Sequence, residues 1–128
     1  MKMNNSGLED NETDGFKSLE NVKLIEKNGN SVTLEFSIQD TSPYFKGHFP
    51  DFQILPAVAQ IEIVIRFSRR YFGTEIALSQ LKRLKFSSLI RPSALLRLKI
   101  ENDGDLISFN LGSSDGGISY SSGTVAAL

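Results

Sequence analysis

The apolar segment over residues 56–72 constrains the fold more than any other part of the chain. Pro56 suits the first turn of a helix, where the N–H that proline lacks is not needed. Gly73 is typical of the position just past a helix end. Between them, the apolar side chains are Ala57, Val58, Ile61, Val64, Ile65 and Phe72. We therefore predict a helix over 56–72 that must be covered on most sides, and one helix cannot cover itself.

Strand patterns on both sides of this segment supply the covering layer. A short strand candidate over 22–27 is followed by Asn28-Gly29, a strong hairpin signal. Alternation of apolar and polar residues then gives one buried and one wet face over 32–38. Further strand candidates, separated by turns, lie at 96–101, 106–111 and 118–126. This order predicts an α+β fold in which a curved antiparallel sheet wraps around one long central helix.

Composition limits the class of protein. The chain has 128 residues, of which 40% are hydrophobic and 23% charged, and it contains no cysteine. A disulfide framework or a thiolate metal site is therefore excluded. The start is acidic rather than basic, and no apolar run approaches the roughly 18 residues of a membrane span. We expect a cytoplasmic protein with a disordered acidic lead over 1–15 and a single domain over 16–128.

Basic residues gather in the second half of the chain. Between Arg66 and Lys99 there are nine basic residues, and Glu75 is the only acid. Such an excess is typical either of solvated strand and helix faces or of a surface that attracts a polyanion or an acidic protein. Nucleic acid is not the expected partner, because the basic residues are spread out and no aromatic stacking motif or DNA-binding pattern accompanies them.

Three features around the helix start could carry chemistry. His48, the only histidine, lies in a tight Gly-His-Phe-Pro turn, as either a proton-transfer group or a structural histidine bonded to backbone. Glu62 lies in the second turn of the helix, either as a general acid in an apolar setting or as the surface partner of Arg66. The N–H of Ala57 lies at the positive end of the helix dipole, where it could polarise a carbonyl oxygen.

Taken together, these residues resemble the FabA/FabZ-like 3-hydroxyacyl-acyl-carrier-protein dehydratases, which have the hotdog fold. The resemblance is carried by PYFKGHFP over residues 43–50, then by Pro56 and Glu62, with a weaker match at Lys85-Phe86 followed by Pro92. It extends from about residue 22 to residue 126. The segment FQILP over 52–56, together with Gln60, is similar to the sequences of the ApeI-type relatives within this group.

The resemblance implies a separate role in the reaction for each of three groups. His48 would take the C2 proton of a 3-hydroxyacyl thioester, Glu62 would protonate or orient the departing hydroxyl, and the Ala57 amide would hold the thioester oxygen. No metal or cofactor is implied. The implied active site forms across a homodimer, with further assembly of dimers left open. The side chains expected to line the substrate tunnel are Phe45, Phe49, Pro56 and Phe86.

An acidic acyl carrier protein is the partner that the resemblance implies. The residues expected to dock it are Arg66, Arg69, Arg70, Lys82 and Arg83. Two alternatives to the dehydratase stay open. One is a hotdog thioesterase, although the histidine turn is atypical of that group. The other is a non-catalytic acyl-binding module, suggested by Ala57, Gln53 and Ser93-Ala94, which replace residues common in the family.

Overall fold

The computed structural model describes residues 16–45 and 53–127, with the backbone alone at 77–81 and 127. The predicted disordered lead over 1–15 lies outside the described residues. Their elements, in chain order, are β1 (Leu19–Lys27), β2 (Ser31–Ile38), the short 3-10 helix η1 (Pro43–Phe45), α2 (Ala57–Phe72), β3 (Ile76–Phe86), β4 (Leu96–Asp103), β5 (Leu106–Ser113) and β6 (Ser119–Ala127).

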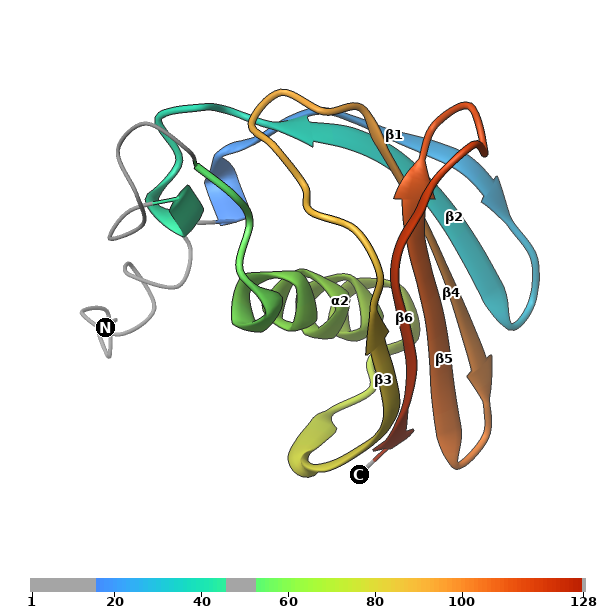
Figure 1. Cartoon of the computed structure of the whole chain (residues 1–128). Helices are drawn as coiled ribbons and strands as arrows, with labels where there is room; N and C mark the ends of the chain where they lie inside the picture. The colour runs from blue at the N-terminus through green and yellow to red at the C-terminus, as the bar shows by residue number, and fades with distance from the viewer. Residues whose placement is uncertain (1–15, 46–52, 128) are drawn as a thin grey trace, which may run out of the picture.

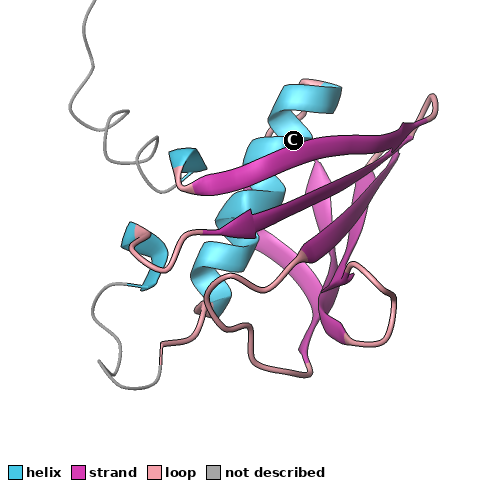
Figure 2. Cartoon of the chain, turned by 90° about the horizontal axis from the view of Figure 1, so that it is seen from above, coloured by secondary structure: helices cyan, strands magenta, loops and turns pink. Residues whose placement is uncertain are grey.

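The strands form one antiparallel sheet that curves around α2, as Figures 1 and 2 show from two directions. Its strand order is β1-β2-β4-β5-β6-β3. β2 pairs with β4, which follows it only after the helix and β3, and β3 pairs with β6 at the far edge. The predicted α+β architecture, a curved sheet around one central helix, is confirmed.

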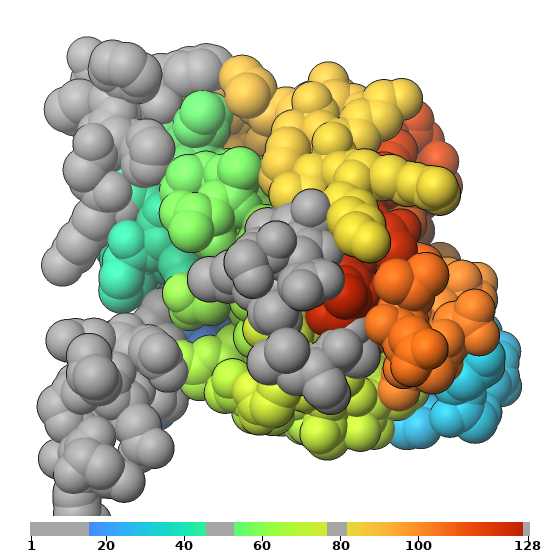
Figure 3. Space-filling model, turned by 90° about the horizontal axis from the view of Figure 1, so that it is seen from below, coloured from blue at the N-terminus to red at the C-terminus, as the bar shows by residue number. Residues whose placement is uncertain are grey.

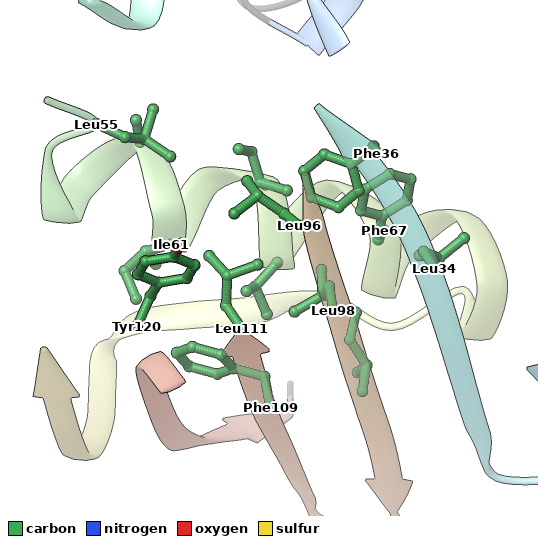
Figure 4. Close-up of a cluster of buried hydrophobic side chains, with 14 of the residues drawn as sticks. Leu34, Phe36, Leu55, Ile61, Phe67, Leu96, Leu98, Phe109, Leu111 and Tyr120 are labelled. Atoms are coloured by element: carbon green, nitrogen blue, oxygen red, sulfur yellow. The ribbon is translucent and has the colours of Figure 1, made fainter. Parts of the chain in front are cut away.

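The core lies between α2 and the concave face of the sheet. Alternate residues of β2, β4 and β5 point into it, so that Leu34 lies opposite Leu98, and Leu98 opposite Leu111, all fully buried. From the helix, Phe67 is fully buried, and its ring centroid lies 5.6 Å from that of Phe36 (Figure 4). The period of two along β2 therefore decides which side chains meet the helix.

The two ends of α2 follow the prediction. Pro56 takes the N-cap position with an extended backbone at ψ 159°. Gly73 closes the helix in the left-handed conformation at φ 64°, and its N–H donates to the Arg69 carbonyl. The expected cover on most sides of the helix is incomplete at its start, because in the single chain Ala57 is exposed and Val58 is 75% exposed. The curved sheet of one chain does not reach this side of the helix start.

Gly112 lies where the backbone of a neighbouring segment comes close. A Cβ at this position would stand 2.7 Å from the Ile118 carbonyl oxygen, which is held by a 2.9 Å hydrogen bond from the Ser113 N–H. We expect Gly112→Ala to lower the free energy of unfolding by about 1–3 kcal/mol, because that carbonyl must shift. Urea denaturation measures the change. Gly29→Ala is the matched control, since nothing lies within 4 Å of its Cβ, and an equal loss in both variants would contradict the explanation.

Candidate active site

The predicted base lies outside the described residues, as does Phe49 of the predicted tunnel. His48 belongs to the segment over 46–52, which connects η1 to the residues that lead into α2. The described part of the site is therefore built from the start of α2, from η1 and from the end of β3. Within it stand the predicted acid Glu62, the predicted amide donor Ala57 and the predicted tunnel residues Phe45, Pro56 and Phe86.

Hydrogen bonds fix the segment that leads into α2. The Leu55 N–H donates to the Ile90 carbonyl at 2.9 Å, and the Gln60 Nε2 donates to the Leu55 carbonyl at 3.1 Å. Ala57 is the first residue of the helix and is not among the described residues with positive φ. Alanine therefore fits this position without strain. The N–H groups of Ala59 and Gln60 donate to the Pro56 carbonyl at 3.1 Å, whereas a helix offers no acceptor to the N–H of its first residue, which lies at the positive end of the dipole.

A cavity of about 240 Å³ opens beside the helix start. It is lined by the predicted residues Pro56, Ala57 and Phe86, and by Ile54, Leu55, Gln60, Ser87, Ser88 and Leu89. The two stretches that supply these residues, at 54–60 and 86–89, adjoin on the face shown in Figure 3, in green and yellow. Most of the lining side chains are apolar, so the cavity suits an acyl chain better than a charged ligand.

Phe45 differs from the other described tunnel residues. It is 1% exposed and belongs to the hydrophobic core cluster, whereas Pro56 and Phe86 line the cavity and Phe86 is 42% exposed. Phe45 anchors the end of η1 in the core, directly before the segment that contains His48. Its role in a substrate tunnel stays a prediction.

Glu62 is half-buried and bonded to a tyrosine. The Tyr44 hydroxyl donates to the Glu62 Oε2 at 2.9 Å. Burial, this hydrogen bond and the negative charge of Glu62 all raise the pKa of Tyr44 above its usual value, while the charge of Arg66 opposes the rise. The phenol therefore stays protonated at neutral pH and acts as the donor of the pair. This bond engages one of the two carboxyl oxygens of Glu62.

Glu62 and the cavity belong to different sides of α2. At 3.6 residues per turn, Gln60 and Glu62 lie about 200° apart around the helix axis. Gln60 faces the cavity, and Glu62 faces η1. A single described chain therefore brings Ala57, Pro56 and Phe86 together and holds Glu62 apart from them.

The predicted docking residues of the helix have partners of their own. Arg69 forms two hydrogen bonds of 3.1 Å with the exposed carboxylate of Glu75. The guanidinium carbons of Arg66 and Arg70 lie 5.8 and 5.1 Å from the Phe16 ring centroid. Stacking on an aromatic face leaves the charge in place, so these two arginines still contribute positive potential to the surface.

The other two predicted docking residues, Lys82 and Arg83, are exposed on β3. Arg83 has a positive φ of 54°, and the pairing of β3 with β6 shifts register between Lys82 and Lys85. Such a bulge bends an edge strand and re-aims its side chains. A carrier-docking role for the five basic residues stays a prediction.

Two residues at the site were not predicted to have a role. Tyr44 is part of the motif over residues 43–50 that carries the family resemblance, and nothing in its spacing of 18 residues from Glu62 indicates a contact between the two. Gln60 is 4% exposed, and its Oε1 has no hydrogen-bond partner among the described residues. Gln60 is a polar residue in the apolar first half of α2, two positions before Glu62. This position was the available sign that the Gln60 side of the helix faces a site.

Neither a metal site nor a membrane-spanning helix is found in the part of the chain that the structure describes. No group of three or more acidic or histidine side chains there could hold a metal ion. None of the helices formed by the same residues has both the length and the apolar character that crossing a bilayer demands.

Curated relatives of the chain are dehydratases. It is 31% identical over 80 residues to the 3-hydroxyacyl-acyl-carrier-protein dehydratase FabZ of Levilactobacillus brevis, a match that covers 57% of this chain and 54% of that protein. The chain thus spans about half the length of this relative. A FabZ dehydratase of Chlamydia pneumoniae is 25% identical over 119 residues, covering 86% of this chain and 73% of the relative.

Solved structures show the fold, and a family model shows the family. The ApeI:P dehydratase heterocomplex of Xenorhabdus doucetiae matches with a TM-score of 0.70 at 24% identity, over 84% of this chain and 97% of that one. A hypothetical thioesterase of Streptococcus pneumoniae matches with a TM-score of 0.61 at 11% identity, over 85% and 90%. At these identities the likeness shows the hotdog fold alone. Because residues 24–124 match the ApeI-like family, described as ApeI dehydratase, the chain belongs to the ApeI-like dehydratases.

Proposed function

We propose that this chain removes water from a 3-hydroxyacyl thioester carried by an acyl carrier protein and gives the 2-enoyl thioester. Membership of a dehydratase family supports the reaction class. The observation that carries the proposal is the largely apolar cavity at the start of α2, which Ala57, Pro56 and Phe86 line together. It offers an acyl thioester an apolar wall beside the N–H groups of a helix N-terminus.

The proposed chemistry assigns one step to each group. His48 takes the proton from C2 while the Ala57 N–H donates to the thioester oxygen, so that the charge that develops there is stabilised. The C3–O bond then breaks, and Glu62 gives a proton to the departing hydroxyl, which leaves as water. Transfer of the proton from His48 back to Glu62 restores both groups. No net oxidation takes place, and the acyl chain loses one molecule of water.

A second copy of the chain is proposed to complete the site. Within one chain, Glu62 lies on the side of α2 away from the cavity, so the cavity needs an acid from elsewhere. Leu89, which lines the cavity, is 57% exposed, and Val58, next to the lining residue Ala57, is 75% exposed. Exposure of this kind is typical of a surface that a partner covers. A homodimer would bring the Glu62 of one copy to the cavity of the other.

The acyl group is proposed to arrive on an acidic carrier protein. Arg66, Arg70, Lys82 and Arg83 supply positive charge on α2 and β3, and this charge would attract and orient an acidic partner. Charge steering of this kind weakens as salt screens it, with a Debye length of about 8 Å at physiological ionic strength. Turnover of a carrier-bound substrate should therefore fall with added salt more steeply than turnover of a free thioester.

The test of the function uses the whole protein and a 3-hydroxyacyl thioester bound to carrier protein. We expect enoyl absorbance to appear with the wild type, and His48→Ala to lower kcat by about 10²–10⁴-fold, because proton abstraction contributes that much in general acid–base catalysis. Full activity of His48→Ala would show that the base is assigned wrongly. Release of free thiol would indicate a thioesterase instead, and binding without turnover would indicate an acyl-binding module.

A further inference from the structure

The Tyr44 side chain is held in place before any substrate binds. Its backbone N–H donates to the Ser42 Oγ at 3.1 Å, and that hydroxyl is within 2.6 Å of the buried Ser18 Oγ. The next residue, Phe45, is fixed in the core and donates its N–H to the Ser42 carbonyl at 3.0 Å. The phenol therefore reaches Glu62 from a rigid short helix rather than from a loose loop.

The contact with Glu62 is more than a packing contact. A carboxyl oxygen can accept a hydroxyl whether the acid is protonated or ionised, so the Tyr44 bond is available to Glu62 as a proton donor. The bond engages Oε2 at 2.9 Å and restricts rotation of the carboxyl group, which leaves Oε1 as the oxygen that carries the proton. An acid that must meet a departing hydroxyl loses rate when its orientation is free, because a misplacement of about 1 Å can cost about 100-fold.

We propose that Tyr44 is a positioning residue for the dehydration, which fixes the Glu62 carboxyl so that Oε1 faces the 3-hydroxyl of the substrate. The inference rests on the proposed function for the identity of the reaction, and on the Tyr44–Glu62 hydrogen bond for the role. The donor is available throughout the neutral range, because burial and the neighbouring carboxylate both raise the pKa of the phenol. Tyr44 does not touch the reacting atoms in this assignment and acts only through Glu62.

Tyr44→Phe is the direct test, because it keeps the ring and removes only the hydroxyl. We expect kcat to fall by about 10–100-fold, because an acid that is misplaced by about 1 Å can lose about 100-fold in rate, while KM changes by less than about twofold. Tyr71→Phe is the matched control. Tyr71 lies on α2, the helix of Glu62, with its ring centroid 6.3 Å from that of Phe67, and the variant should keep wild-type kcat. An active Tyr44→Phe variant with wild-type kcat would overturn the proposal.

A double-mutant cycle shows whether Tyr44 acts through Glu62. In a Glu62→Ala background, the residual rate should not fall further when Tyr44 is also changed to Phe, because the hydrogen bond is already gone. The same loss in both backgrounds would overturn the proposal. Circular dichroism of each variant verifies that it is folded, and Glu62→Leu, which also removes the acceptor oxygens and leaves a smaller void, replaces Glu62→Ala if the latter unfolds.

A spectroscopic measurement separates the failure of this inference from the failure of the proposed function. The side-chain carboxyl carbon of Glu62 is followed by nuclear magnetic resonance in protein labelled with carbon-13, and its signal is assigned by its loss in Glu62→Ala. Tyr44→Phe should move this signal, because the hydroxyl donates directly to the carboxyl group. If the wild type forms no enoyl product but this shift occurs, the function is wrong and the pairing stands. If the signal is the same with and without the Tyr44 hydroxyl, the pairing is overturned.

Discussion

Equal amounts of His48→Ala and Glu62→Gln protein, mixed so that subunits exchange, should recover about a quarter of wild-type dehydratase activity. Random pairing makes half of the dimers mixed, and each mixed dimer holds one intact site and one doubly altered site. Half of the dimers with half of their sites intact gives that quarter. The expectation follows from the two sides of α2, because Glu62 faces η1 while the cavity lies on the opposite side.

Each variant alone should have very little activity. Loss of the base or of the acid is expected to lower kcat by about 10²–10⁴-fold, the usual contribution of a positioned general acid or base. Glu62→Gln keeps the size of the side chain and an oxygen that can accept the Tyr44 hydroxyl, so the change removes a proton donor rather than a packing contact. The assay is enoyl formation from a 3-hydroxyacyl thioester, before and after co-refolding of the two proteins.

A matched control comes from the same region of the chain. Glu75→Gln removes an exposed acid that pairs with Arg69 beyond the end of α2, and it should leave kcat unchanged. Two different affinity tags on the His48→Ala and Glu62→Gln chains then test the exchange itself, since only a mixed dimer is retained on both resins. If mixed dimers form and the mixture still stays inactive, the base and acid of one site come from the same chain.

Local patterns predicted the elements of the fold well. Alternation over 32–38 predicted the buried face of β2, and Pro56 with Gly73 predicted both ends of α2. Asn28-Gly29 predicted the first hairpin, whose turn carries a 2.9 Å hydrogen bond from the Asn28 N–H to the Ser31 carbonyl. These features depend on backbone preferences and on periodicity, which act over a few residues and can therefore be found in one sequence.

Long-range arrangements could not be predicted in the same way. The order in which β2 pairs with β4, and β3 with β6, depends on how the sheet closes around the helix, and a spacing pattern carries no information on that closure. The contact between Tyr44 and Glu62 also could not be predicted, because it joins η1 to α2 and depends on how these elements pack in the folded chain. The apolar helix was expected to be covered on most sides, yet Val58 at its start is 75% exposed in the single chain. Periodicity identifies apolar side chains, but it does not distinguish those that face the core from those that do not.

Phe67→Ala should lower the free energy of unfolding by about 3–5 kcal/mol, the largest effect on stability expected of a single substitution in the core. Phe67 is fully buried, beside Phe36 as Figure 4 shows, and its ring centroid lies 5.6 Å from that of Phe36. The centroid of the Phe16 ring lies 5.0 Å from it. It joins the helix to the first strands of the sheet, so the cavity left by its removal cannot be filled by one neighbour alone. Urea denaturation at a fixed protomer concentration measures the loss, because subunit association would otherwise shift the midpoint.

Two further variants separate a cavity from a general weakening. Phe67→Leu leaves a smaller void and should cost clearly less than Phe67→Ala, since the cost of a core truncation grows with the cavity that remains. Leu24→Ala, at a residue of β1 that is 51% exposed, should change stability by about 0.5 kcal/mol. If Phe67→Ala cost no more than Leu24→Ala, the contact of α2 with the concave face would not be what holds the sheet around the helix. The same contact sets the orientation of α2, and with it the position of Glu62 five residues earlier, so Phe67→Ala should also lower kcat in molecules that remain folded.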